Sequence, residues 1–278
     1  MLEIVELRVI EKNAWRVFGS DEGISLGSIR KVQIPGSDPR MATIAQLQRE
    51  LVEGGEQPLF SGWNIHRHYS AKELAEAELL TMWISAVFEP AGEETKTVYD
   101  ETDACPLCGV GRRQVGDLSL DTRRIPKRAD LAQTIANEVV FSPRLVALLT
   151  KEATTGVEFR SVRHRGKEVS EDWLQPVITS PSLDVVEPTQ YGTNLFDHDP
   201  EGRFRCPLGH TLGLNLISEL FLDRSTWAGE DFCATRQLVG VKRGLLRPRA
   251  SLLISQRLYQ LLKREKARGF KVEVAHLS

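Results

Sequence analysis

The chain has 278 residues, of which 41% are hydrophobic and 27% are charged, and its formal net charge is −2. This composition is typical of a soluble globular protein with one large or two modest domains. No apolar run approaches the roughly 18 residues that a membrane helix needs, and the start, MLEIVELRVIEKNAW, is acidic where a secretory signal needs a basic flank. We therefore expect a cytoplasmic protein that does not enter a membrane.

The charges are distributed unevenly along the chain. Residues 1–104 contain 18 acidic and 10 basic residues, whereas residues 105–278 contain 20 acidic and 26 basic residues. Clustered charge accelerates encounter with a partner of opposite sign, so an acidic N-terminal portion predicts a basic partner. The alternative is two solvated surfaces of opposite sign with no partner role.

The first hundred residues predict a small mixed α and β portion. Alternating apolar residues over 4–10 indicate a strand, and the apolar spacing over 41–52 indicates a helix. A helix is also expected over 69–80, because Ser70 and Glu73 have the spacing of a capping box. A strand should follow over 81–89, and the polar, acidic stretch 89–103 is the candidate linker.

The C-terminal part contains an internal repeat. SPRLVALLTKEATTG (142–156) and SQRLYQLLKREKARG (255–269) align without gaps at an offset of 113 and agree at 7 of 15 positions. Each copy lies between two apolar runs, which predicts a strand–helix–strand unit that occurs twice. The alternative is a chance match between two short leucine-rich helices.

Both copies have the same local signals. Ser142 and Ser255 are expected to cap the helix N-terminus, and Pro143 suits the first helical position. Gly156 and Gly269 are expected to end the helices in a left-handed conformation. Leucines at helical spacing form one apolar face in each copy.

A Cys-Pro-Leu-Cys-Gly motif begins at Cys105. The thiolates of Cys105 and Cys108 can reach one ion, proline stiffens the turn, and Gly109 lets backbone N–H groups face the sulfur atoms. A related Cys-Pro-Leu-Gly-His sequence begins at Cys206, with Gly209 where a second cysteine would stand. His210 follows, and its longer side chain can replace the missing thiolate.

We therefore predict a structural Zn²⁺ site formed by Cys105, Cys108, Cys206 and His210. A closed four-ligand site contributes folding energy rather than chemistry. Cys233 competes for the fourth position, and another ligand or water is a further alternative. A redox role for Cys105 and Cys108 is disfavoured because no thioredoxin-like pattern follows them.

No sequence motif indicates an enzyme. The chain has no H-x-E that would complete a zinc deaminase, no G-x-S-x-G, no H-E-x-x-H and no phosphate-binding lysine loop. Basic clusters follow the first cysteine pair over 112–128 and recur at 160–167 and 242–249, which suggests nucleic-acid binding. These clusters are interrupted by acids and have few aromatic residues for base stacking, so nucleic acid is only the alternative partner.

Several segments together resemble a known family. They are YSAKELAEAELL, CPLCGVG, GDLSL, DLAQTIANEVVFSPRLVALL, TGVEF and SQRLYQLL, spread over residues 69–278. This combination resembles the double-CxxCG motif proteins of myxobacteria, which are similar to immunity proteins of the swarm-inhibition, polymorphic-toxin type. The resemblance implies a cytoplasmic, non-catalytic protein that binds one cognate toxin. Gly209 departs from the family pattern, which expects a cysteine there.

We predict an α+β fold with an acidic N-terminal portion, residues 1–100, and a duplicated strand–helix–strand domain joined by zinc, residues 101–278. The expected partner is a toxin protein, docked on the acidic portion through residues such as Glu73, Glu76 and Glu78.

Overall fold

A computed structural model describes all 278 residues and divides them into two compact units, Met1–Leu74 (unit 1) and Ala75–Ser278 (unit 2). The sequence-based boundary between residues 100 and 101 falls inside unit 2. The polar stretch 89–103 likewise lies within unit 2, where the hydroxyl groups of Thr95 and Thr97 donate to the carbonyl of Ser119. None of the helices combines the length and the apolar character needed to cross a bilayer.

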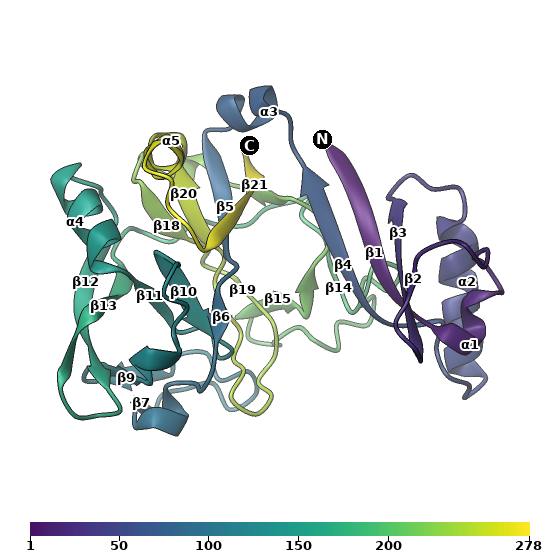
Figure 1. Cartoon of the computed structure of the whole chain (residues 1–278), viewed down its shortest axis with the longest axis horizontal. Helices are drawn as coiled ribbons and strands as arrows, with labels where there is room; N and C mark the ends of the chain where they lie inside the picture. Colours follow the sequence, from purple (N-terminus) through teal and green to yellow (C-terminus); the bar gives the residue numbers. More distant parts are fainter. The chain divides into compact units, whose positions relative to one another are not determined.

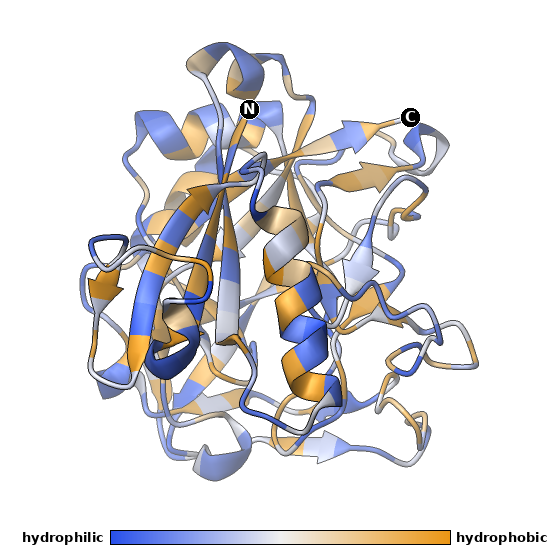
Figure 2. Cartoon of the chain, turned by 90° about the vertical axis from the view of Figure 1, so that its right-hand side faces the viewer, coloured by the Kyte–Doolittle hydropathy of each residue, from blue (hydrophilic) through white to orange (hydrophobic).

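Unit 1 is a four-stranded antiparallel sheet with one long helix (Figure 1). The strand order is β2–β3–β1–β4, and the elements are β1 (Leu2–Ile10), α1 (Glu11–Ala14), β2 (Ile24–Ser25), β3 (Ile29–Pro35), α2 (Met41–Glu53) and β4 (Phe60–His68). Val5, Leu7 and Val9 are fully buried, which confirms the strand predicted from alternating apolar residues. The helix predicted over 41–52 is confirmed by α2, and Figure 2 shows polar and apolar residues interleaved along both kinds of element.

The predicted capping box is present, but its helix is short. The backbone N–H of Ser70 donates to the Glu73 carboxylate, and the backbone N–H of Glu73 donates to the Ser70 hydroxyl. Helix α3 then spans only Ala71–Glu76. The helix predicted up to residue 80 is wrong at its end, because Leu79 and Leu80 are fully buried in the next strand, β5.

Unit 2 is built on two larger sheets. The six-stranded sheet has the order β6 (Val87–Phe88), β10 (Leu131–Thr134), β11 (Val139–Phe141), β13 (Val169–Ile178), β12 (Val157–His164) and β9 (Leu118–Leu120). The five-stranded sheet has the order β17 (Leu220–Leu222), β21 (Phe270–Leu277), β5 (Leu79–Ile84), β20 (Leu252–Ser255) and β18 (Phe232–Ala234).

Shorter elements connect these strands. Three two-stranded sheets pair β7 (Val98–Asp100) with β8 (Arg113–Val115), β14 (Tyr191–Gly192) with β16 (Asn215–Leu216), and β15 (Thr211–Gly213) with β19 (Leu238–Val239). The helices are α4 (Pro143–Lys151), α5 (Gln256–Arg264) and the 3₁₀ turns η1 (Glu93–Thr95), η2 (Thr122–Arg124) and η3 (Arg224–Thr226). The mixed α+β class is therefore correct, with far more sheet than helix.

The two larger sheets have matching strand directions. In each sheet the middle strand, β13 or β5, is antiparallel to both neighbours. One edge strand is parallel to the strand beside it in each sheet, β9 to β12 and β17 to β21. The middle strand β5 comes from the start of unit 2, although every other strand of its sheet lies after residue 219.

Each sheet has its own apolar core. The first core contains Phe88, Leu118, Leu120, Ile125, Ala132, Val140, Val162 and Trp173. The second contains Leu79, Leu183, Leu220, Leu222, Cys233, Leu253 and Ala275.

The predicted N-terminal caps of α4 and α5 are confirmed, whereas the predicted C-terminal caps are wrong. The hydroxyls of Ser142 and Ser255 accept hydrogen bonds from the backbone three residues ahead. The helices end at Lys151 and Arg264, well before Gly156 and Gly269. Each glycine instead opens the following strand with a positive φ, because it passes close to the opposite half of unit 2.

Two buried aspartates link the N-termini of α4 and α5 to the loops that contain Gly156 and Gly269. Asp130 accepts hydrogen bonds from Ser142 Oγ, from Arg144 Nε and Nη2, and from the Arg268 backbone N–H. Asp231 accepts hydrogen bonds from Ser255 Oγ, from Arg257, and from the backbone N–H and hydroxyl of Thr155. Each carboxylate thereby joins its own helix to the loop that follows the other helix.

We predict that Gly156→Ala and Gly269→Ala destabilise the protein severely. An alanine Cβ would lie 2.1 Å from the Phe232 carbonyl oxygen at position 156 and 2.0 Å from the Leu131 carbonyl oxygen at position 269. Backbone overlap and left-handed strain each cost about 1–3 kcal/mol. Gly229→Ala is the matched control, because Gly229 also has a positive φ but nothing lies within 4 Å of its Cβ position. Equal urea midpoints for Gly156→Ala and Gly229→Ala would show that the close approach to the Phe232 carbonyl does not reduce the stability of the variant.

We also predict that Asp231 makes the fold acid-sensitive. Burial raises the pKa of Asp231, but the hydrogen bonds from Arg257, Thr155 and Ser255 outweigh burial and hold the pKa below its usual value. The stabilisation is therefore complete above the unfolded pKa of about 3.9 and is lost as pH falls through the lower folded value. Thermal melts from pH 7 to pH 2 should show a smaller acid-dependent loss in Asp231→Asn than in the native chain. Exposed Asp172→Asn should lose stability like the native chain, and identical profiles for all three proteins would contradict the prediction.

Candidate metal centre

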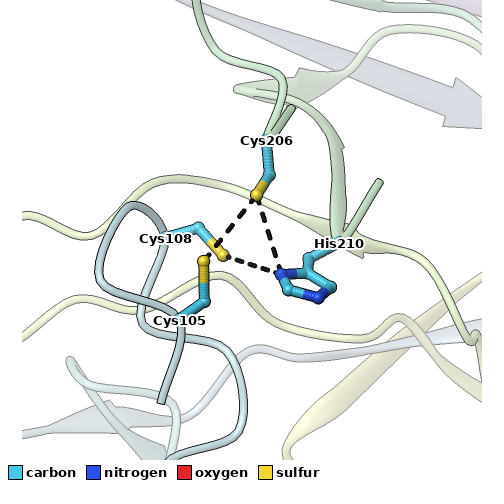
Figure 3. A group of neighbouring side chains, drawn as sticks. All are labelled: Cys105, Cys108, Cys206 and His210. Carbon is cyan, nitrogen blue, oxygen red and sulfur yellow. Dashed lines mark hydrogen bonds between the residues drawn. The ribbon is translucent and has the colours of Figure 1, made fainter. Parts of the chain in front are cut away.

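Two loops of unit 2 bring four potential metal ligands together (Figure 3). Cys105 and Cys108 come from the loop between β7 and β8, and Cys206 and His210 come from the loop before β15. The three sulfur atoms and the imidazole nitrogen all lie within 4.8 Å of one another. These are the four residues predicted from sequence, and the three cysteines are buried.

The measured separations suit one tetrahedral ion. The Sγ atoms of Cys105 and Cys206 are 3.9 Å apart, and His210 Nδ1 lies 3.5 Å from Cys108 Sγ and 3.6 Å from Cys206 Sγ. A tetrahedral ion with metal–sulfur bonds of about 2.3 Å and a metal–nitrogen bond of about 2.0–2.1 Å separates two sulfurs by roughly 3.8 Å and sulfur from nitrogen by roughly 3.6 Å. The residues can therefore hold a metal ion without rearrangement.

The first loop folds as its sequence predicts. The backbone N–H of Gly109 donates to the Cys105 carbonyl at 2.7 Å, and Gly109 has a φ of 74°. Hydrogen bonds from the backbone N–H groups of Cys108 and Leu107 lower the pKa of Cys105 to about 6. At Cys105 the loop thus favours the thiolate, the form that binds metal, whereas burial raises the pKa of Cys108 to about 11.

The second loop turns back three residues after its first cysteine, one residue earlier than the first loop does. The backbone N–H of Gly209 donates to the Cys206 carbonyl at 2.8 Å, and Gly209 has a φ of 77°. The left-handed backbone explains glycine at this position. Steric exclusion of a side chain does not explain it, because nothing lies within 4 Å of the Cβ position. The earlier turn leaves His210 to supply the fourth ligand atom through Nδ1, so that its proton resides on Nε2 when metal is bound.

Cys233 lies outside the centre. It is fully buried in the apolar core of the five-stranded sheet, on β18, and burial raises the pKa of its thiol to about 11. Its sulfur lies 3.7 Å from the carbonyl oxygen of Glu230. Cys233 is therefore a small core residue in this fold and not the fourth member of the cluster.

Basic residues near the centre are paired with acids. Glu101 contacts Lys242 at 3.3 Å and Arg247 at 2.9 Å, and the aliphatic parts of both basic side chains approach Gly109. Arg112 pairs with Glu93 and stacks on the Tyr99 ring. These contacts tie the metal-binding loop to the connection between β19 and β20.

No family model matches the chain, and a search of curated proteins finds no match.

Sequence reasoning missed the two buried aspartates. The segments ADLAQT (129–134) and EDFCAT (230–235) share an aspartate and, four residues later, a threonine, at an offset of 101. Cys105 and Cys206 have the same offset, so this alignment was the signal that could have identified Asp130 and Asp231.

We predict that the chain binds about one metal ion and that His210 is a ligand. Cys206→Ser and His210→Ala should lose most of the metal and melt at lower temperature, because the ion joins two segments about 100 residues apart. Cys233→Ala is the matched control and should keep the metal. Elemental analysis after gel filtration measures the metal content of each variant. If His210→Ala keeps all its metal and Cys233→Ala loses it, Cys233 and not His210 is the fourth ligand.

Proposed function

We propose that the centre binds Zn²⁺ in a structural role. Three thiolates and one imidazole are the donor set of closed structural zinc sites, and all four coordination positions are filled by protein. Zinc there would clamp the β7–β8 loop to the segment before β15. Elemental analysis of the native chain distinguishes zinc from iron.

We also propose that unit 2 is a duplicated fold whose halves exchange a strand. With β9, β12, β10 and β11 matched to β17, β21, β18 and β20, the two sheets have the same order and directions. β13 then matches β5. Leu183 matches Phe88, because Leu183 pairs in parallel with Thr235 and Phe88 pairs in parallel with Thr134, the residue equivalent to Thr235. The half that contains β5 would supply every strand of the six-stranded sheet except β13. The half that contains β13 would supply every strand of the five-stranded sheet except β5.

The apolar cores support this duplication. Each of the seven buried residues in the second core falls at the position of a residue in the first core. The pairs are Leu79 with Trp173, Leu183 with Phe88, Leu220 with Leu118, Leu222 with Leu120, Cys233 with Ala132, Leu253 with Val140, and Ala275 with Val162. A chance likeness of two leucine-rich helices does not produce such agreement across five strands.

We propose that the protein is a non-catalytic immunity protein that binds and neutralises a cognate toxin. The observation that carries this proposal is the four-residue centre in the sequence order of the double-CxxCG motif proteins, with His210 in place of the second cysteine of the second motif. A centre closed by four protein ligands leaves no position for a substrate, which suits a scaffold for binding rather than a catalyst.

The structure changes the expected docking surface. Unit 1 contains ten acidic and nine basic residues, so the acidic excess of the first 104 residues belongs to 75–104 in unit 2. There Glu78 pairs with Arg224, Asp103 with Arg113, and Glu101 with three basic residues. Glu73 pairs with the N-terminal amine of its own unit. Acidic charge alone therefore no longer marks a toxin surface.

The same pairs weaken the nucleic-acid alternative. Arg112, Arg113 and Arg247 have carboxylate partners, so binding phosphate groups there would require breaking ion pairs that already exist.

We predict that the chain forms a one-to-one complex with the product of a neighbouring gene and rescues growth when that product is expressed. Cys206→Ser should protect poorly because loss of the metal destabilises unit 2, while Cys233→Ala should protect normally. Growth assays and light scattering of the purified complex provide the readout.

The alternative predicts a different result for the isolated chain. Salt-dependent binding to DNA or RNA, without rescue by any neighbouring pair, would replace immunity with nucleic-acid binding.

A further inference from the structure

Unit 2 contains a pocket of about 270 Å³, close to the lower size limit of small-molecule sites. Its walls come from both larger sheets, which lie near one another in Figure 1. Three equivalent pairs line it: Ile84 with Ile178, Gln133 with Ala234, and Val139 with Leu252. Met82 and Trp83 add further apolar surface.

Arg249 gives this pocket a cationic wall. Its guanidinium lies over the Trp83 ring at 5.4 Å, and Nη1 donates to the Asn137 side-chain oxygen at 2.7 Å. Asn137 is neutral, and Arg249 makes no ion pair, whereas Arg144, Arg247 and Arg257 each pair with a carboxylate. The side chain is exposed at the pocket, yet enough protein surrounds it to lower the pKa of Arg249 by desolvation.

Arg249 comes from a connection that is longer in one half of unit 2 than in the other. Residues 135–138 join β10 to β11, whereas residues 235–251 join β18 to β20. The offset between the halves rises from 101 at the aspartates to 113 at the cap serines, which places a 12-residue insertion in this connection. At the offset of 113, Arg249, Ala250 and Ser251 correspond to Ala136, Asn137 and Glu138. The backbone N–H of Ser251 donates to Thr235 just as that of Glu138 donates to Thr134. Arg249 therefore lies at the end of the longer connection, where the other half has alanine.

We propose that this pocket binds a small monocarboxylate with an apolar body. The planar guanidinium can donate two parallel hydrogen bonds to a carboxylate, and Asn137 fixes its orientation from the other side. One cation matches one negative charge, while a phosphate dianion would lack a second cation among the lining residues. Met82, Ile84 and Ile178 offer an apolar surface for a ring or short chain. This inference is independent of toxin binding.

The test uses the purified full-length chain and isothermal titration with benzoate, benzamide and inorganic phosphate. Benzoate should bind saturably at one site, and benzamide and phosphate should bind at least about tenfold more weakly, because a charged hydrogen bond contributes about 1.5–3 kcal/mol. Arg249→Gln and Arg249→Lys should both weaken benzoate at least about tenfold, since lysine lacks the two-pronged donor.

Two further variants distinguish pocket binding from a general loss of positive charge. Arg236→Gln removes an exposed arginine that pairs with Asp184 outside the pocket, and it should bind benzoate like the native chain. Ala250→Leu keeps Arg249 but narrows the pocket, and it should weaken benzoate. Circular dichroism checks that each variant is folded. No benzoate binding, equal binding of benzamide, preference for phosphate, or unchanged affinity in Arg249→Gln would each overturn the proposal.

Discussion

Unit 2 depends on two buried carboxylates that are each shared between distant segments. Asp231 binds the start of α5 through Ser255 and Arg257 and holds the loop after α4 through Thr155. Asp130 binds the start of α4 and holds the loop after α5. Each buried carboxylate has a serine and an arginine from its own helix, and a backbone N–H from the loop after the other helix completes its set of partners. These bonds hold the two loops in place, and the strands that follow the loops pair with β13 and β5.

The metal centre adds a second link at a different place. It joins the loop after β7 to the loop before β15, whereas the aspartates act beside α4 and α5. In both loops a left-handed glycine turns the backbone, but in the second loop it comes one residue earlier relative to the first cysteine. The fourth ligand atom comes from the histidine after that glycine, because the left-handed backbone of the earlier turn favours glycine at position 209 itself.

Much of the candidate site could be predicted from sequence because its signals are local. The Cys-Pro-Leu motifs define two turns, and His210 directly follows Gly209 of the second motif, whereas the competing ligand Cys233 lies 23 residues farther on. The N-terminal caps Ser142 and Ser255 were predictable for the same reason. Long-range features were not predictable: the roles of Gly156 and Gly269 depend on carbonyl groups from the opposite half. A count of charges along the chain also does not show ion pairs such as Glu78 with Arg224, which lie 146 residues apart.

The proposed duplication would place the main difference between the halves of unit 2 in one connection. Core positions are apolar in both, so Ala132 corresponds to Cys233, which is not a ligand of the centre. The connection after β18 is longer than the one after β10, and its residues make two kinds of contact. Lys242 and Arg247 bind Glu101 beside the metal-binding loop, whereas Arg249 faces the pocket without an acidic partner. Arg249 is exposed, so water solvates its charge in the free chain, as it does at Arg243 of the same connection. The proposed carboxylate ligand would replace that water and supply the negative charge that no residue of the chain supplies to Arg249.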